Sequence, residues 1–238
     1  MSTGPLAVRW GAAPALEPQA GARARVTVDL ENAGTVAWRD GINVAYHWLD
    51  SRDNPIVWDG DRTPAPYLEP GARGTVDVAV RAPIPPGPYR LAFDLVAEHR
   101  AWFSELGSAM LPIDVIVAAR QGEPRADLPP GVEATPAWQE HVRAAHADGY
   151  AVVAGSIEWA GGLRAPRPRK LAPYLPGTGR VPKFGWPLLC PSVLDGVALE
   201  RLGDVAGLPA FAAPTDEPWI YDGRAVLRAR PRSGRRPT

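Results

Sequence analysis

Cysteine is almost absent from this sequence, and long apolar runs are missing altogether. The 238 residues include one cysteine, Cys190, so an internal disulfide and a zinc site built from thiolates are both excluded. No apolar run approaches the ~20 residues that a membrane-spanning helix needs. The N-terminal residues contain neither the basic stretch nor the apolar stretch of a secretory signal. We therefore expect a cytoplasmic protein without a membrane span.

The net charge is zero, because 26 basic side chains balance 26 acidic ones. This balance argues against nucleic acid as a partner, since nucleic-acid-binding domains carry an excess of basic side chains. The two halves of the chain nevertheless differ. Residues 1–118 carry 10 basic and 14 acidic side chains, net −4, whereas residues 119–238 carry 16 and 12, net +4. This asymmetry predicts two parts with different partners.

Glycine and proline are abundant, at 24 and 28 residues, which favours short strands and many turns over long helices. In residues 1–118, apolar and polar residues alternate with a period of two, as expected for antiparallel strands with one buried face. The five clearest runs are residues 26–30, 42–48, 76–80, 89–95 and 113–117, and two shorter runs are residues 6–10 and 56–58. Seven short strands in about 115 residues predict a mostly-β fold, an immunoglobulin-like antiparallel β-sandwich.

Several short motifs lie between and within these runs. They are Glu31-Asn32-Ala33-Gly34-Thr35-Val36-Ala37-Trp38, Tyr46-His47-Trp48-Leu49-Asp50, Val57-Trp58-Asp59-Gly60, Pro70-Gly71, Pro86-Gly87-Pro88-Tyr89 and Ala101-Trp102-Phe103. With these motifs, residues 5–118 resemble a bacterial immunoglobulin-like family related to the four-tryptophan (FW) domains of autophagy cargo receptors. Similar modules are appended to actinobacterial glycosyltransferases, methyltransferases and polysaccharide-export proteins. The resemblance implies a non-catalytic binding or spacer module, although sandwiches host unrelated functions.

Tryptophan decides whether such a module can bind a sugar, because an indole face stacks on the C–H face of a pyranose. Trp38 and Trp48 are predicted to fill the core between the two sheets. Trp58 and Trp102 lie beside polar, turn-rich segments, so ligand binding and core packing are both open for them. Tyr89 begins a strand after a turn, which is the position of a tyrosine corner, whose hydroxyl bonds to nearby backbone.

Asp59-Gly60-Asp61 matches the Asp-x-Asp pattern with which glycosyltransferases hold a metal ion on a nucleotide sugar. No α/β nucleotide-binding pattern surrounds it, and Asp and Gly are common turn residues, so we interpret the segment as a turn. A calcium site built from Asp50, Asp53, Asp59 and Asp61 is the alternative. We expect neither a metal nor a cofactor.

The second half predicts a small α+β domain over residues 136–230, preceded by a linker over 119–135 in which proline and charge dominate. A strand over 150–157, a weaker helix over 194–202 and a hairpin over 219–227 with an Asp-Gly turn are expected in this domain. Residues 231–238 are expected to form a disordered tail.

The clearest helix signal covers residues 136–148. Thr135 and Pro136 are typical N-cap and N1 residues, and Gly149 is a typical stop. Trp138, Val142 and Ala145 would share the apolar face. His141 and His146 are five residues apart, roughly 140° around the helix axis, so they cannot bind one metal side by side. We interpret both as surface or boundary histidines.

One segment of the second half is basic and aromatic. Between Glu158 and Asp195 no acidic residue occurs. The candidate ligand-binding residues of this segment are Arg164, Arg167, Arg169, Lys170, Tyr174, Arg180 and Trp186. Guanidinium groups bind phosphate and carboxylate, and aromatic rings stack on a sugar or a base. We predict that this segment, together with Trp58 and Trp102, binds a glycan or an acidic or phosphorylated ligand. A solvated, arginine-rich loop is the alternative.

The sequence contains no catalytic constellation. Ser156 lacks the Gly-x-Ser-x-Gly motif of a nucleophilic serine, and Cys190 has apolar neighbours and is expected to be buried and inert. We therefore expect a non-catalytic accessory protein that binds carbohydrate or protein in cell-envelope polysaccharide assembly. One alternative is a sugar-modifying transferase with its site in the basic 158–190 segment or at Asp59 and Asp61. A purely structural docking module is the other.

Overall fold

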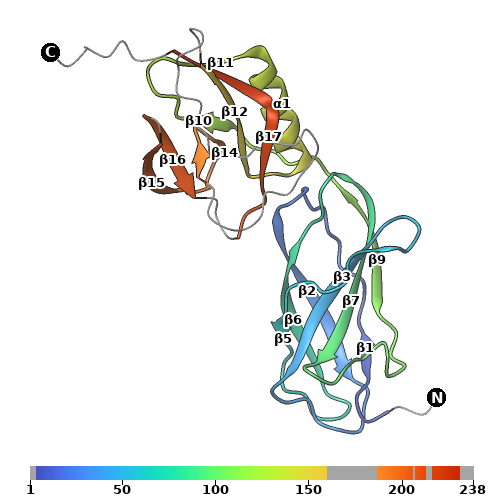
Figure 1. Cartoon of the computed structure of the whole chain (residues 1–238). Coiled ribbons are helices and arrows are strands. Elements are labelled where there is room, and N and C mark those ends of the chain that lie inside the picture. Colours follow the sequence, from blue (N-terminus) through green and yellow to red (C-terminus); the bar gives the residue numbers. More distant parts are fainter. Residues whose placement is uncertain (1–3, 160–186, 206, 213–215, 231–238) are drawn as a thin grey trace, which may run out of the picture. The chain divides into compact units, whose positions relative to one another are not determined.

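The computed structural model describes residues 4–159, 187–205, 207–212 and 216–230. The chain divides into two compact units, Met1–Ala119 and Arg120–Thr238. The fold is mostly β, with one helix among the described residues (Figure 1).

The first unit is an immunoglobulin-like sandwich of two antiparallel sheets, which Figure 1 shows as two layers. The smaller sheet has the order β1 (Val8–Trp10), β2 (Arg23–Asn32) and β6 (Arg73–Arg81). The larger sheet has the order β4 (Pro55–Val57), β3 (Ile42–Leu49), β7 (Gly87–Ala97) and β8 (Ala101–Trp102), with β5 (Thr63–Pro64) paired to β3 and β9 (Leu111–Val117) paired to β7. The predicted fold class is therefore confirmed.

The core lies between the two sheets and contains the predicted alternating residues. Val26, Val28 and Leu30 of β2 are buried against apolar side chains of β3 and β7. Trp38 and Trp48 are both completely buried, which confirms the two predicted core tryptophans. Their burial removes large apolar surfaces from water, which is the main stabilising contribution to such a sandwich.

The tyrosine corner is also confirmed. The Tyr89 hydroxyl donates a hydrogen bond to the Pro85 carbonyl oxygen at 2.6 Å. The Tyr89 ring meets the ring of Trp48 edge to face, with centroids 6.2 Å apart. The tyrosine thus fixes the turn before β7 and supports the core at the same time.

The second unit contains a five-stranded and a three-stranded sheet. The larger sheet has the order β10 (Pro124–Ala126), β14 (Ser192–Leu194), β12 (Val152–Trp159), β17 (Trp219–Ala229) and β11 (Val132–Ala134). The smaller one has the order β13 (Leu188–Leu189), β16 (Leu208–Ala212) and β15 (Glu200–Val205). The central strands β12 and β17 run parallel, and the other pairings of these sheets are antiparallel.

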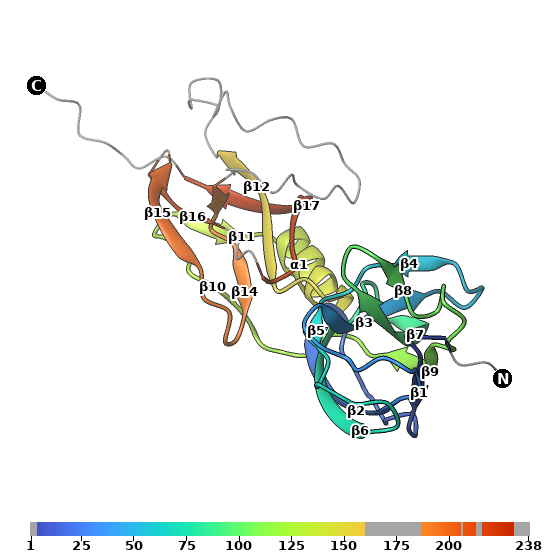
Figure 2. The same ribbon diagram turned by 90° about the horizontal axis from the view of Figure 1, so that it is seen from below.

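Helix α1 (Pro136–Asp148) has the predicted bounds and lies against β12 and β17, as Figure 2 shows. The Thr135 side chain accepts a hydrogen bond from the Trp138 amide, which satisfies one of the free amides of the first turn. Gly149 ends the helix with a φ of 124°, a conformation that residues with a Cβ rarely adopt. Among the described residues, no helix is long and apolar enough to cross a membrane.

Two predictions for the second half are wrong. The expected linker over 119–135 contains β10 and β11, the two edge strands of the larger sheet. The expected helix over 194–202 is replaced by the end of β14, a turn and the start of β15. Strand pairing decides both segments: β10, β11 and β14 pair with residues far away in the sequence, and β15 pairs with the neighbouring strand β16. The predicted tail over 231–238 lies outside the described residues.

The predicted Asp-Gly hairpin is wrong as well, because β17 continues through Asp222 and Gly223. Its pairing with β12 shifts between Gly155, which faces Asp222, and Ser156, which faces Val226. Three residues of β17 therefore leave the ladder as a bulge, and the Ser156 hydroxyl donates to the Gly223 carbonyl oxygen at 2.8 Å. The turn-forming residues are used inside a strand and do not reverse the chain.

Candidate functional site

Trp58 and Trp102 lie together on the outer face of the larger sheet of the sandwich. Both rings contact the imidazole of His47, which lies between them on β3. The centroids of His47 and Trp58 are 4.1 Å apart with the rings nearly parallel, and those of His47 and Trp102 are 4.6 Å apart with the rings tilted. We refer to His47, Trp58, Arg62, Asp94 and Trp102 as the outer-face cluster.

The alternation of β3 explains why His47 faces outward. Its neighbours Tyr46 and Trp48 are in the core, so the side chain between them projects from the opposite face. Strands β4 and β5 both pair with β3, and the chain between them, from Trp58 to Arg62, leaves the ladder and carries the indole of Trp58 over the imidazole ring.

Gly60 allows this detour to pass close to β3. Its amide donates to the Tyr46 carbonyl oxygen at 3.0 Å. A Cβ at this position would lie 2.5 Å from a ring carbon of Tyr46 and 2.6 Å from its carbonyl oxygen, which is shorter than any normal contact. The approach therefore requires glycine.

The base of the cluster is a buried polar pair. His47 and Asp94 are both completely buried, and His47 Nε2 lies 3.8 Å from Asp94 Oδ2. The Trp58 carbonyl oxygen lies against His47 Nδ1; because a carbonyl only accepts, Nδ1 must donate. Asp94 Oδ1 accepts from the Leu95 amide at 2.7 Å, whereas Oδ2 and Nε2 have no hydrogen-bond partner among the described residues.

Arg62 is held against Trp102 by several contacts. Its guanidinium carbon lies 4.8 Å from the centre of the Trp102 ring, within the range of a cation–π interaction. The same group forms an ion pair with Asp59 and a second one with Glu98, at 3.1 Å between Nε and Oε1. Glu98 Oε1 also accepts from the Asn43 amide group at 2.7 Å. The side chains around Trp102 are thus fixed by one another.

The two indoles differ in their accessibility. Trp58 remains 46% exposed, and the neighbouring Ile56 of β4 is also exposed. Trp102 is only partly exposed, since it contacts both Arg62 and His47. Neither indole is in the sandwich core, so of the two alternatives left by the sequence, core packing is excluded. Trp58 offers the larger accessible aromatic surface.

The remaining predicted ligand-binding residues belong to the basic segment of the second half. Arg164, Arg167, Arg169, Lys170, Tyr174, Arg180 and Trp186 lie outside the described residues.

The aspartates near the outer-face cluster have local partners. Asp50 accepts from the amides of Arg52 and Asn54, and hydrogen bonds from Asn54 lower the pKa of the Asp50 carboxyl group. Asp53 forms an ion pair with Arg90. In the described parts of the chain, no three His, Cys, Asp or Glu side chains meet as a metal ion would require.

A serine–histidine pair occurs in the second unit, but it is buried. His146 Nε2 lies 2.9 Å from Ser192 Oγ, and His146 Nδ1 lies 2.8 Å from the Tyr150 carbonyl oxygen. Both side chains are almost fully inaccessible, so a substrate cannot reach them. Burial lowers the pKa of His146. The prediction of a surface or boundary position is therefore wrong for this histidine, which lies on the buried face of α1.

Asp222 forms a buried ion pair in the second unit. Asp222 is buried and accepts two hydrogen bonds from the Arg224 guanidinium group, while His141 Nδ1 lies 4.0 Å away. Burial alone would raise the pKa of Asp222, but the hydrogen bonds from Arg224 outweigh it and lower that pKa. The group is a satisfied ion pair that fixes the bulge of β17.

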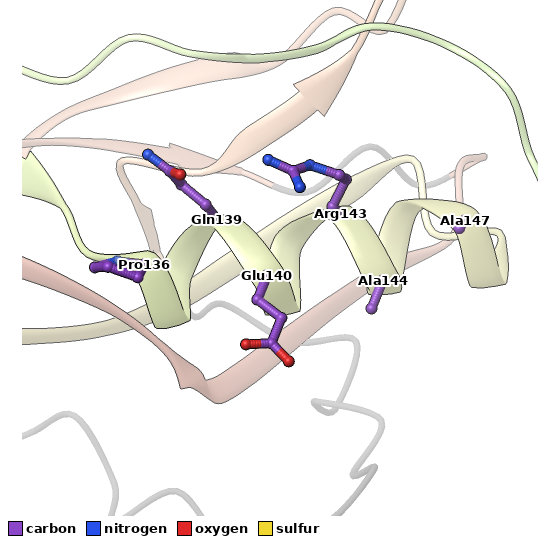
Figure 3. Close-up of a pocket in the computed structure, with 6 residues that line it drawn as sticks. All are labelled: Pro136, Gln139, Glu140, Arg143, Ala144 and Ala147. Atoms are coloured by element: carbon purple, nitrogen blue, oxygen red, sulfur yellow. The ribbon is translucent and has the colours of Figure 1, made fainter.

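An open hollow lies along the solvent-facing side of α1 (Figure 3). Its lining residues are Pro136, Gln139, Glu140, Arg143, Ala144 and Ala147. The side chain of Glu140 points away from those of Gln139 and Arg143, so the polar groups do not converge on one point. This hollow therefore offers no chemistry for a site.

The sequence did not indicate that His47 and Asp94 would form the base of the outer-face cluster. Their positions on outward faces of β3 and β7 could be read from the alternation, but outward faces normally meet solvent. The two indoles that cover them come from β8 and from the segment after β4, and this covering depends on tertiary structure.

Comparisons with known proteins gave no relative by sequence: no protein family and no curated protein matches the chain. Among solved structures, a β-glucosidase from Listeria innocua in complex with isofagomine matches at 17% identity and a TM-score of 0.31, over 46% of this chain and 16% of that chain. A Salmonella α-2-macroglobulin mutant matches at 18% identity and a TM-score of 0.28, over 59% of this chain and 9% of that chain. The chain thus spans a small part of each of these proteins.

Proposed function

We propose that the sandwich is a non-catalytic carbohydrate-binding module and that the sugar stacks on Trp58. The observation that carries this proposal is the half-exposed indole of Trp58, held nearly parallel to the fixed ring of His47. Since one face of the indole covers His47, its accessible surface is the opposite face and the edge. A flat, solvent-facing aromatic surface is what the apolar face of a pyranose requires.

The rigidity of the site supports this function. Trp58 is held by its ring contact with His47 and by its own carbonyl oxygen, which accepts from the same imidazole. A side chain that is already ordered loses little conformational entropy when a ligand binds. The module would act as an accessory domain in cell-envelope polysaccharide assembly, as the resemblance to modules appended to glycosyltransferases implies.

The test is binding of the intact chain to an array of neutral and acidic bacterial oligosaccharides, followed by calorimetry on the best ligand. Trp58→Ala is expected to weaken binding at least about tenfold, as for an aromatic residue at the centre of a binding site. Tyr67→Ala is the control, because Tyr67 is an even more exposed aromatic residue that lies outside the outer-face cluster. Equal affinities of Trp58→Ala and the unchanged protein would exclude Trp58 as the sugar site.

A further inference from the structure

The charges around Trp58 and Trp102 restrict the kind of sugar that this site can take. Resting on the function proposed above, we propose that the outer-face cluster selects neutral sugars and disfavours sugars that carry a carboxylate or phosphate. This ligand class differs from the acidic or phosphorylated one that the basic segment 158–190 suggested.

Carboxylates outnumber cations in the two segments that hold the indoles. Residues 58–62 and 98–105 contain four carboxylates, from Asp59, Asp61, Glu98 and Glu105, and two guanidinium groups, from Arg62 and Arg100. A fifth carboxylate, Asp94, lies beneath the rings beside His47. An anion placed on Trp58 would therefore face an excess of negative charge, whose repulsion is moderate at a solvated surface.

The cation at the centre of the cluster is already neutralised. Arg62 is shared between Asp59 and Glu98, donates to the Gly60 carbonyl oxygen at 3.0 Å and lies over Trp102. An acidic sugar would have to displace one of these carboxylates to reach the guanidinium group. Arg62 thus orients its neighbours and is not poised to bind an anion.

The same carboxylates suit a neutral sugar. A carboxylate accepts hydrogen bonds only, and sugar hydroxyls donate them. Asp59 is largely exposed, and the Glu98 carboxylate is held in place by Arg62 and Asn43. Fixed acceptors beside an exposed indole match a ring whose apolar face stacks while its hydroxyls point sideways.

Arg100 is the one cation of these two segments whose charge could attract an acidic sugar and so oppose the preference for neutral sugars. It is exposed in the turn before β8, two residues from Trp102, and no ion pair of Arg100 occurs within the described ranges. The experiment therefore includes Arg100→Gln.

The experiment compares neutral oligosaccharides with uronic-acid-containing and phosphorylated ones on the same array, using the intact chain and Trp58→Ala. We expect binding that depends on Trp58 only for neutral sugars, with affinities unchanged between low and high salt. Acidic sugars are expected to bind at least about fivefold more weakly, as two nearby carboxylates at a solvated surface would impose. Arg100→Gln should leave neutral binding unchanged.

The double variant D59N/E98Q tests the cause. It removes both carboxylates from Arg62 and should raise binding of acidic sugars at least about fivefold. Asp114→Asn is the control, because Asp114 also pairs with an arginine, Arg90, but outside the outer-face cluster. Trp58-dependent binding of acidic sugars as tight as that of neutral ones would overturn the inference and leave the proposed function standing. If no sugar binds in a Trp58-dependent way, the proposed function itself fails, and the inference with it.

Discussion

His47 Nε2 and Asp94 Oδ2 lie 3.8 Å apart, and both side chains are completely buried on the face of the sheet that faces away from the sandwich core. Since His47 Nδ1 donates to the Trp58 carbonyl oxygen, Nε2 of a neutral imidazole is an acceptor, and so is a carboxylate oxygen. At 3.8 Å the two atoms are too far apart for a direct hydrogen bond, and neither has a hydrogen-bond partner among the described residues. Asp94 is thus the buried polar neighbour of the imidazole on which Trp58 rests.

This relationship predicts different effects for two substitutions. His47→Ala leaves the Asp94 carboxylate buried without its partner and should lower the free energy of unfolding by about 3–5 kcal/mol. Asp94→Asn should cost less than about 1 kcal/mol, because the amide is of equal size and can donate to Nε2. Urea unfolding of both variants, followed by tryptophan fluorescence, measures the difference. Equal losses for both variants would show that the Asp94 carboxylate does not depend on His47 as its buried partner.

Gly60 is predicted to be essential for placing Trp58. Gly60→Ala forces a Cβ to within 2.5 Å of the Tyr46 ring, and such overpacking typically costs about 1–3 kcal/mol. The variant should have a lower melting temperature and should also bind sugar more weakly, because the segment after β4 must shift. Gly4→Ala is the control, since the nearest atom to an added Cβ there is 3.9 Å away. An unchanged melting temperature for Gly60→Ala would show that the close approach to Tyr46 is not formed.

His146 predicts a pH dependence of the second unit. Burial lowers the pKa of folded His146 below its ordinary value of 6.5, so the unfolded chain binds a proton more readily than the folded one. The stabilisation is fully present above pH 6.5 and is lost as the pH falls through the region below it. Hydrogen exchange of the β12 and β14 amides at pH 7.5 and pH 5 should show this loss.

Replacing the histidine provides the control for that measurement. His146→Gln should remove most of the pH dependence in this range, because glutamine does not titrate. If the β12 and β14 amides exchange with the same stability at both pH values in the unchanged protein, His146 is not buried as described.

Cys190 is predicted to be unreactive in the folded protein. Burial, with a smaller contribution from Asp127, raises the pKa of its thiol to about 11. At pH 8 roughly one thiol in a thousand is then ionised, and only the thiolate is a nucleophile. Alkylation by iodoacetamide should therefore be at least about a hundredfold slower in buffer than in urea. Similar rates in the two solutions would mean that Cys190 is accessible.

The sequence predicted those parts of the structure in which local pattern and tertiary packing agree. The alternation around Val28, Trp48 and Phe93 located the sandwich strands, and the Thr135 cap located α1. The sequence did not predict the bulge at Asp222. The Asp222-Gly223 pair is typical of a hairpin turn, but it also fits inside β17, where the partner strand β12 places Gly155 opposite Asp222. A Cβ at Gly155 would lie 1.9 Å from the Ala225 carbonyl oxygen, so the bulge requires glycine at this position of β12. This requirement depends on the pairing of β12 with β17, which the local sequence does not show.

For the candidate site, the sequence indicated Trp58 and Trp102 as candidate ligand-binding residues but not what lies beneath them. Polar residues on the outward face of an alternating strand are expected to meet solvent, whereas His47 and Asp94 are completely buried. They are buried because residues 58–62, which connect β4 and β5, and the two-residue strand β8 cover them. Segments this short have no periodic pattern by which the sequence could reveal them.

The most direct test of the account is a titration of the intact chain with the neutral oligosaccharide that binds best on the array, followed through the indole N–H signals in two-dimensional NMR spectra. The account predicts that the signal of Trp58, assigned from the spectrum of Trp58→Phe, shifts strongly, while those of the buried Trp38 and Trp48 do not move. A saturating ligand that leaves the Trp58 signal in place would contradict it.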